Sequence, residues 1–365
     1  MAIAANQKII SHHEKIQITW MINSANRRLA AALEEAGLDY RTLDLRPSFS
    51  LIRNPFAALG KILKIKRALR QLHPGLVVIV QGSILDAFDG VLAARLARLR
   101  YCSYIPMAHS PIEYSEHRFV HMRSAVVSLF FRFVPFFITI DEQQADRLRR
   151  WNRKAQIAVV ENFIPRPAMS VRKTAEVRKS LGIPVDATVL GVVGRIDFRQ
   201  KAQDWLVNVQ KEGSLLEGKV LVFIGDGPDS PRLTQLIESS PWREHIYQLG
   251  WRDGLDGVYD AIDLLIIPSR TEGVPLVMLE ALARRVPVVG SDRDGMKSWL
   301  PSQWRFPFGD SAAMKHSINW ALGRSDAGYW DAIEKHLANA TDEERFACQF
   351  ANTLIKFGSR SPETQ

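Results

Sequence analysis

Two glutamates lie eight residues apart in a segment that follows the apolar run 264–267. Glu272 falls in the loop after that run, and Glu280 falls inside a helix that Pro275 can begin. Loops at the carboxyl ends of parallel strands are where open α/β sheets bind ligands. A carboxylate accepts several hydrogen bonds and suits the paired hydroxyls of a sugar. The alternative is that one glutamate favours the helix N-terminus while the other is solvated.

A second candidate follows the apolar run 189–193. There Gly191 and Gly194 precede Arg195, and Lys201 comes six residues after that arginine. A glycine turn before a helix lets a phosphate approach the backbone closely, and the two cations add fixed positive charge. No Gly-Lys-Ser/Thr sequence and no third glycine follow, so neither a Walker loop nor a dinucleotide fingerprint is indicated. A purely structural turn is the alternative.

One histidine also stands at the carboxyl end of a predicted strand. His109 follows the run 101–105. A neutral imidazole there could hydrogen-bond a sugar hydroxyl, whereas the alternative is a loop histidine that caps a turn.

The sequence Asp292-Arg-Asp294 has the spacing of a metal site. It follows the run 286–289 in a turn rich in Gly and Ser, where aspartates usually bond to nearby backbone. We therefore expect loop hydrogen bonds and no metal.

The elements that must position these residues alternate between short apolar runs and segments of helical periodicity. Strands are predicted at residues 16–22, 76–80, 101–105, 136–140, 157–160, 189–193, 220–224, 246–249, 264–267 and 286–289. Helices are predicted at residues 24–36 (with Ser24 as N-cap), 55–72, 86–99, 141–151, 201–210, 231–238, 275–284 and from 311 to about 356. Continuous apolar strands alternating with helices predict a doubly wound α/β fold with parallel sheets.

The chain has 365 residues, which suggests two domains. Pro165, Pro167 and a polar stretch at 162–176 separate the two series of strands and helices. We expect a Rossmann-like domain at 1–165, a second at 175–330, and carboxy-terminal helices at 331–365 that return toward the first.

The composition is that of a globular protein, with 46% hydrophobic and 24% charged residues, which excludes disordered and collagen-like classes. Two cysteines are too few for a disulfide framework and favour a reducing compartment. The most apolar stretch, residues 125–140, contains Arg132 and Pro135 and is too short to span a bilayer. No secretory leader is visible at residues 1–10. We expect a cytoplasmic protein.

The net charge of +9 is concentrated in one half of the chain. Residues 1–170 contain 24 Lys or Arg against 13 Asp or Glu, and residues 171–365 contain 24 against 26. A basic half indicates a polyanionic partner, and charge that serves only solubility is the alternative. No zinc spacing or aromatic-interleaved basic strand supports nucleic acid, so we expect none.

Five basic residues recur at helical spacing within 61–70, with apolar residues between them: Lys61, Lys64, Lys66, Arg67 and Arg70. This pattern predicts an amphipathic basic helix that binds an anionic membrane, here the inner face of the membrane. The alternative is a helix face that is merely solvated.

Taken together, these motifs resemble glycosyltransferase family 4, the retaining, nucleotide-sugar-dependent transferases of GT-B fold. The resemblance is close over residues 185–300 and loose in the amino-terminal half. The residues that carry it are Gly191–Arg195, Lys201, Gly225-Asp-Gly227, Leu249-Gly250, Tyr259–Asp263, Pro268-Ser269, Glu272, Glu280 and Pro287–Ser291.

The resemblance implies a role for each matching residue. Arg195 and Lys201 would bind the donor diphosphate, Glu280 the ribose, and Glu272 the transferred sugar, which His109 would face. The implied donor-binding residues are Gly194, Arg195, Lys201, Gly225, Glu272, Gly273, Val274, Pro275, Leu276 and Glu280. No metal and no cofactor are implied, because a nucleotide-diphosphate sugar of the UDP or GDP type is the co-substrate.

The expected function is therefore that of a metal-independent retaining hexosyltransferase acting on a glycan or lipid-linked acceptor in surface polysaccharide synthesis. The amino-terminal half departs from the family pattern. Residues 1–10 predict a helix, so the sequence pattern lacks the first strand and glycine loop of the family. The alternatives are an amino-terminally truncated, weakly active donor-binding or scaffold protein, and a GT-B nucleotide-sugar epimerase.

Overall fold

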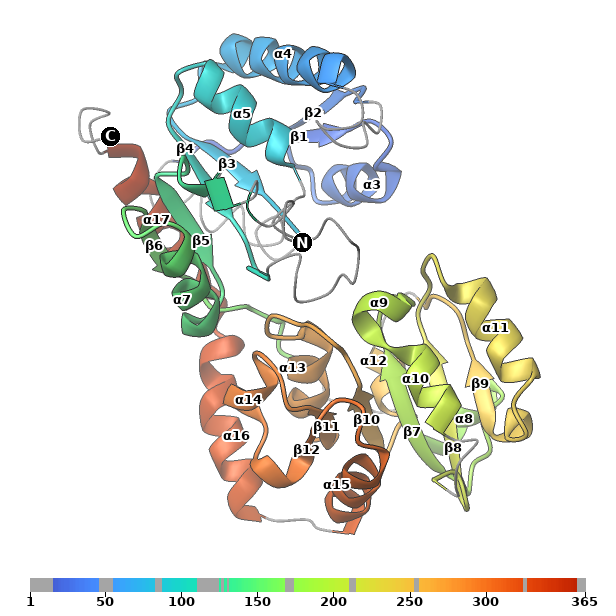
Figure 1. The fold of residues 1–365 in the computed structure, drawn as a ribbon. Coiled ribbons are helices and arrows are strands. Elements are labelled where there is room, and N and C mark those ends of the chain that lie inside the picture. The colour runs from blue at the N-terminus through green and yellow to red at the C-terminus, as the bar shows by residue number, and fades with distance from the viewer. Residues whose placement is uncertain are drawn as a thin grey trace. The chain divides into compact units, whose positions relative to one another are not determined.

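The computed structural model describes residues 16–45, 55–82, 87–109, 125, 128–129, 131–167, 174–209, 215–252, 256–323 and 327–359. The chain forms two compact units (Figure 1). Unit 1 consists of Met1–Phe163 and Asp342–Gln365, and unit 2 consists of Ile164–Thr341. The helix predicted at residues 1–10 lies outside the described residues.

Unit 1 contains two parallel sheets. In the first, β1 (Trp20–Asn23) pairs with β2 (Tyr40–Leu43). The second has the order β3-β4-β5-β6, with β3 at Val77–Val80, β4 at Tyr101–Tyr104, β5 at Phe136–Thr139 and β6 at Gln156–Val159. Among the described residues of this unit, the helices with given bounds are α3 (Arg27–Glu35), α4 (Pro55–Leu72), α5 (Phe88–Leu96), α7 (Glu142–Trp151) and α17 (Glu343–Ser359).

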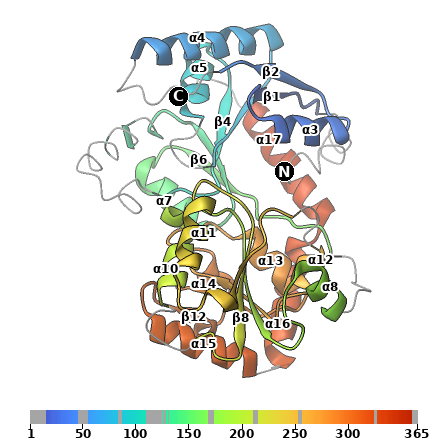
Figure 2. The same ribbon diagram turned by 90° about the vertical axis from the view of Figure 1, so that its right-hand side faces the viewer.

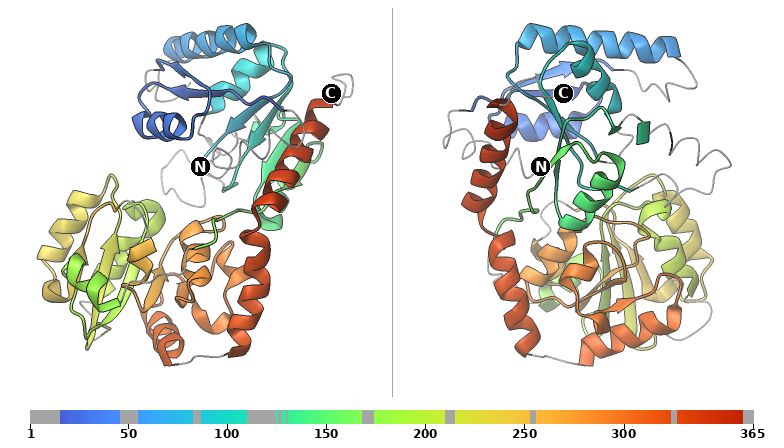
Figure 3. Two further views of the ribbon diagram at one scale, coloured as in Figure 1. Left: turned by 180° about the vertical axis from the view of Figure 1, so that it is seen from behind. Right: turned by 60° about the vertical axis from the view of Figure 1, so that its left-hand side comes forward.

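The four-stranded sheet of unit 1 is apolar on both faces. Successive strand residues point to opposite sides, so Phe137 packs in a cluster with α4, α5 and α7, while Phe136 packs against α17. The Phe136 and Phe357 rings stack with centroids 4.6 Å apart. Figures 2 and 3 show α17 running along this unit. The last helix of the chain thereby completes the core of unit 1.

The N-cap of helix α3 lies two residues later than predicted. The side chain of Asn26, not that of Ser24, caps α3 and accepts the Leu29 N–H at 3.2 Å. The prediction of Ser24 as N-cap is therefore wrong, because Ser24 still belongs to the turn after β1.

Unit 2 is built on one parallel sheet of six strands in the order β12-β11-β10-β7-β8-β9. The strands are β7 (Thr188–Val193), β8 (Lys219–Ile224), β9 (Ile246–Gln248), β10 (Leu264–Ile267), β11 (Val288–Ser291) and β12 (Arg305–Phe306). The helices are α8 (Thr174–Leu181), α9 (Phe198–Lys201), α10 (Gln203–Asn208), α11 (Ser230–Glu238), α12 (Asp256–Tyr259), α13 (Leu276–Ala283), α14 (Met296–Trp299), α15 (Ser311–Gly323) and α16 (Ala327–Ala340). The predicted α/β class with parallel sheets is confirmed.

The order of the strands reverses between β7 and β10. From β7 the chain adds β8 and β9 on one side, and then it crosses to the other side to add β10, β11 and β12. Ligands of open α/β sheets bind outside the carboxyl ends of the strands at such a reversal. The loops that follow β7 and β10 therefore meet where a ligand site is expected.

Candidate functional site

The loops after β7 and β10 are joined by hydrogen bonds. Gln200, in the short helix α9 that follows β7, accepts the Arg270 N–H on its carbonyl at 2.7 Å. Its side-chain Nε2 donates to the Thr271 carbonyl at 3.4 Å. Two motifs some 70 residues apart in the sequence thus form one structure at the strand reversal.

Lys201 and Glu272 are in direct contact across these loops. Lys201 Nζ forms an ion pair with Glu272 Oε1, and the same oxygen accepts the Ser269 hydroxyl at 2.6 Å. The Glu272 side chain is 5% exposed and that of Lys201 is 22% exposed. A nearly buried carboxylate is thereby held in place by a cation that can still reach solvent.

The backbone of Glu272 is held from the loop after β11. The Glu272 N–H donates to Asp294 Oδ2 at 2.9 Å, and the Gly295 N–H donates to the Gly273 carbonyl at 3.0 Å. A Cβ on Gly295 would come within 2.7 Å of the Val274 side chain, so only glycine fits without a shift. The loop after β10 is therefore clamped on two sides.

The loops after β7 and β8 pack backbone against backbone. Gly194 donates its N–H to the Ile224 carbonyl at 2.9 Å, and a Cβ on Gly225 would collide with the Gly194 carbonyl. Both glycines have strongly positive φ, 136° and 139°. Gly191 instead lies inside β7 against Ile262, so its role is packing of the sheet.

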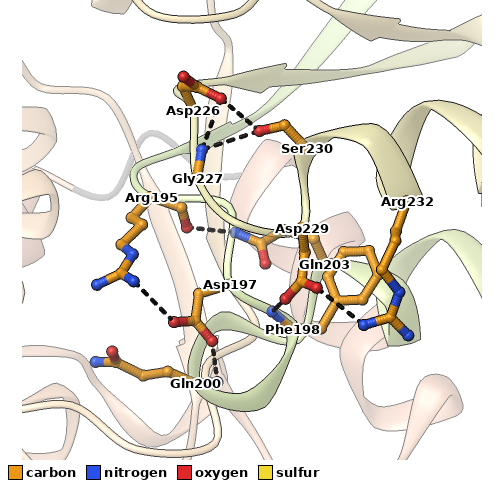
Figure 4. A network of polar contacts seen from close by, with 10 residues as sticks. All are labelled: Arg195, Asp197, Phe198, Gln200, Gln203, Asp226, Gly227, Asp229, Ser230 and Arg232. Carbon is orange, nitrogen blue, oxygen red and sulfur yellow. Dashed lines mark hydrogen bonds and ion pairs between the residues drawn. The ribbon is translucent and has the colours of Figure 1, made fainter. Parts of the chain in front are cut away.

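Arg195 extends from the turn after β7 (Figure 4). Its side chain is 64% exposed and its guanidinium lies 3.6 Å from the Asp197 carboxylate. Asp197 Oδ1 also accepts the Gln200 N–H at 3.4 Å, and Asp229 Oδ2 accepts the Phe198 N–H at 2.9 Å. Two carboxylates therefore accept N–H groups at the start of α9.

Glu280 lies on α13, where its Oε2 accepts the Tyr259 hydroxyl at 2.6 Å. Burial and the neighbouring Glu280 carboxylate raise the pKa of the Tyr259 phenol above its usual value. The phenol is thus a fixed hydrogen-bond donor that orients Glu280.

The three residues between Glu272 and α13 differ in exposure from the first residue of that helix. Gly273, Val274 and Pro275 are buried, and Pro275 is the N-cap residue of α13. Leu276, the first residue of the helix, is 42% exposed.

His109 belongs to unit 1 and lies beyond the carboxyl end of β4. It is 4% exposed, and its Nδ1 contacts the Arg147 guanidinium from α7. The preceding Ala108 N–H donates to Gln144 Oε1 at 2.8 Å. Within unit 1, His109 is thus a buried residue tied to a helix.

The Asp292-Arg-Asp294 segment contacts basic side chains and backbone. Asp292 pairs with Arg305 and lies 3.7 Å from Lys297, and Asp294 faces the Glu272 N–H. Within the described ranges, no group of three or more His, Cys, Asp or Glu side chains could hold a metal ion. None of the described helices is both long and apolar enough to cross a membrane.

Three residues that position the site were missed as site residues in the sequence: Ser269, Asp294 and Tyr259. Ser269 precedes Glu272 by three residues directly after β10, which is a usable signal. Asp294 and Tyr259 come from other loops and helices, so only the folded chain brings them to the two glutamates.

Comparison with known proteins gives matches to sugar-transferring enzymes. Residues 187–324 match the family described as Glycosyl transferases group 1. The 2-deoxystreptamine N-acetyl-D-glucosaminyltransferase of Streptomyces fradiae is 29% identical over 290 residues, which are 73% of this chain and 67% of that protein. The putative teichuronic acid biosynthesis glycosyltransferase TuaC of Bacillus subtilis is 39% identical over 123 residues, 34% of this chain and 29% of that relative.

Solved structures share the fold over nearly the whole chain. Anabaena Alr3699/HepE, solved in complex with UDP-glucose, superposes with a TM-score of 0.76 at 17% identity, over 97% of this chain and 95% of that one. This likeness establishes a common architecture.

Proposed function

We propose that this chain transfers a sugar from a nucleotide-diphosphate sugar. The proposal starts from its GT-B fold and from the match of residues 187–324 to the family described as Glycosyl transferases group 1. The acceptor is a glycan or a lipid-linked sugar in the synthesis of a surface polysaccharide. The similarity to a putative teichuronic acid biosynthesis glycosyltransferase and the UDP-glucose complex of the structural neighbour support this proposal.

The observation that carries the proposal is the contact of Lys201 with Glu272 at the strand reversal of unit 2. Breaking a glycosyl–phosphate bond builds negative charge on the departing diphosphate. Preorganised cations beside that charge stabilise the transition state by several kcal/mol. Arg195 and Lys201 supply such cations, while Glu272 offers acceptor oxygens to sugar hydroxyls and Glu280 to the ribose.

We assign the diphosphate contacts to the side chains of Arg195 and Lys201, because carboxylates already occupy the start of α9. Two cations can neutralise the leaving group without a metal ion, so metal independence is part of the proposal. Retention of the anomeric configuration is proposed on the family resemblance.

A panel of UDP- and GDP-sugars tests this function. We expect the nucleotide sugars of one base, uracil or guanine, to raise the unfolding temperature of the protein, because a ligand that binds only the folded state stabilises it. The same donor should then release its nucleoside diphosphate. Binding without release would favour the donor-binding or scaffold alternative, and conversion of the donor to another nucleotide sugar would favour the epimerase.

The basic helix α4 supports a membrane partner. In the structure, some of its residues are buried or paired and others are exposed. Ile62, Ile65 and Leu69 are buried in the core of unit 1, so they are not available to a membrane. Lys61 is paired with Asp89, and Lys64 donates to the Asp44 carbonyl at 2.6 Å. The part of the helix that can meet a partner is therefore smaller than the sequence pattern suggested.

The outward stripe of α4 is apolar in its first half and basic in its second. Phe56 is 86% exposed, Leu59 49% and Leu63 48%. Lys66, Arg67 and Arg70 follow on the helix, which is labelled in Figure 2. Together with His73, just after the helix, they line a shallow hollow beside Leu63 and Gln71. The helix contains no acidic residue. Apolar side chains beside cations match the acyl boundary and headgroups of an anionic bilayer.

We therefore propose peripheral attachment of the protein, on the cytoplasmic side, to an anionic membrane through α4. Each basic residue near such a surface contributes about 1 kcal/mol, so Lys66→Gln, Arg67→Gln and Arg70→Gln together should weaken vesicle binding about 100-fold. Arg150→Gln, Arg153→Gln and Lys154→Gln make the same charge change at exposed positions of unit 1 and serve as control. The proposal would be contradicted if the protein sedimented equally with neutral vesicles and with anionic vesicles that contain phosphatidylglycerol.

A further inference from the structure

Helix α7 holds the segment that carries His109 at two adjacent residues. Gln144 Oε1 accepts the Ala108 N–H at 2.8 Å, and the Arg147 guanidinium contacts Nδ1 of His109. Gln144 and Arg147 are three residues apart and therefore lie on the same face of the helix. The backbone and the ring of this segment are thus fixed by one helix face.

The helix that makes these contacts is itself well anchored. Asp141 caps it by accepting the Gln144 N–H on Oδ1 at 2.7 Å. At the other end, the Asn152 amide donates to the carbonyls of Phe131 and Val134, both at 2.9 Å. Gln144 is completely buried. Side chains on such a support hold their partners in one geometry.

The chemistry of the arginine determines the protonation of the ring. A guanidinium has five N–H donors and no acceptor. Its hydrogen bond to Nδ1 therefore requires a lone pair on Nδ1, and a proton there would place two donors against each other. In this geometry the imidazole is neutral and its proton is on Nε2.

We propose that Arg147 is a positioning residue that, with Gln144, fixes His109 as a neutral hydrogen-bond donor through Nε2–H. The consequence is a chemical restriction on the site. His109 offers one N–H to an oxygen ligand and acts neither as a general base through Nε2 nor as a cation.

Under the proposed function a sugar hydroxyl would accept this N–H, so the identity of the oxygen ligand rests on that function. The tautomer itself does not depend on that function. It can be tested on the protein without any ligand.

The test is long-range ¹H–¹⁵N NMR at pH 7.0 on full-length protein labelled at histidine nitrogen, with His109→Gln identifying the His109 signals. We expect a non-protonated Nδ1 and a protonated Nε2 in the wild type. Arg147→Met should shift the ring toward a mixture of forms, and Arg147→Lys, which again presents only donors, should restore the Nε2–H form. Arg150→Met, an exposed arginine of the same helix, should leave the signals unchanged.

An Nδ1–H tautomer or an imidazolium in the wild type overturns the proposal, and so does a spectrum that Arg147→Met leaves unaltered. The wild-type measurement stands even where a variant fails to fold. A separate assay follows donor consumption. Loss of one oriented hydrogen bond predicts a fall of about 3- to 10-fold in kcat/KM for Arg147→Met. An unchanged kcat/KM beside an altered tautomer contradicts the role of His109 in sugar transfer and leaves the positioning by Arg147 intact.

Discussion

Lys201 Nζ and Glu272 Oε1 form an ion pair although 71 residues separate them in the chain. The pair sits where β7 and β10 lie side by side, and Ser269 donates to the same carboxylate oxygen. In the proposed reaction the lysine serves the diphosphate and the glutamate serves the sugar. The ion pair therefore holds the residue for the diphosphate beside the residue for the sugar before the donor binds.

Replacing one partner of this ion pair should lower the free energy of unfolding more than replacing both. Lys201→Met leaves the nearly buried Glu272 carboxylate without its cation, so we expect a loss of about 1–3 kcal/mol in the free energy of unfolding of unit 2. Adding Glu272→Gln should recover part of that loss. The measurement is a double-mutant cycle by denaturant titration. Additive effects of the two substitutions would show that the pair is not coupled.

Asp294 should matter through the backbone of Glu272. Its carboxylate accepts the Glu272 N–H, and its φ of 45° lies in the left-handed region that asparagine and glycine tolerate best. We expect Asp294→Asn to keep most activity. Asp294→Gly should lose activity because it lacks the acceptor, and Asp294→Ala should lose more because its backbone is also strained at this positive φ. Steady-state kinetics with the identified donor measure this order. Equal activity of the Asn and Ala variants would contradict it.

Tyr259→Phe should raise the KM for the nucleotide sugar about 3- to 10-fold, since it removes the hydrogen bond that orients Glu280. The raised pKa of the Tyr259 phenol keeps its proton in place at alkaline pH. The wild-type KM should therefore show no inflection from Tyr259 between pH 7 and 10. An unchanged KM in the variant would indicate that Glu280 needs no orientation.

Cys102 should make unit 1 less stable at alkaline pH. Complete burial raises the pKa of its thiol from 9.0 to about 12. Between these values the unfolded chain binds fewer protons than the folded one, so stability falls as pH rises above 9, by at most about 1.4 kcal/mol per pH unit. Urea titrations at pH 8, 9 and 10 measure the slope. Cys102→Ala should reduce it, while Cys348→Ala, in a partly buried position, should keep it.

Most strands were predictable because they are continuous apolar runs. Leu264–Ile267 matches its prediction residue for residue, whereas β11 begins at Val288, two residues later than predicted, since Pro287 lacks the N–H that a strand would donate. The strands β2 and β12 were missed. Tyr40–Leu43 carries polar residues at its centre, and Arg305–Phe306 is only two residues long.

The site was predictable in its residue types and less so in its geometry. The spacing of glycines, cations and glutamates marked the two loops. No local sequence pattern predicts the order of the strands, and it is this order that brings Lys201 to Glu272. The same holds for Asp294, which the sequence suggested as a partner for its own loop. Its carboxylate instead contacts the backbone of another loop, because β10 and β11 are neighbours.

The most direct test of sugar transfer at this site is the release of nucleoside diphosphate from the donor identified in the panel. We predict that Arg195→Ala and Glu272→Gln each lower the rate about 100-fold, since each removes a preorganised contact to the reacting donor. Glu238→Gln, an exposed carboxylate on α11, should release nucleotide at the wild-type rate. Wild-type release by both Arg195→Ala and Glu272→Gln would contradict the account.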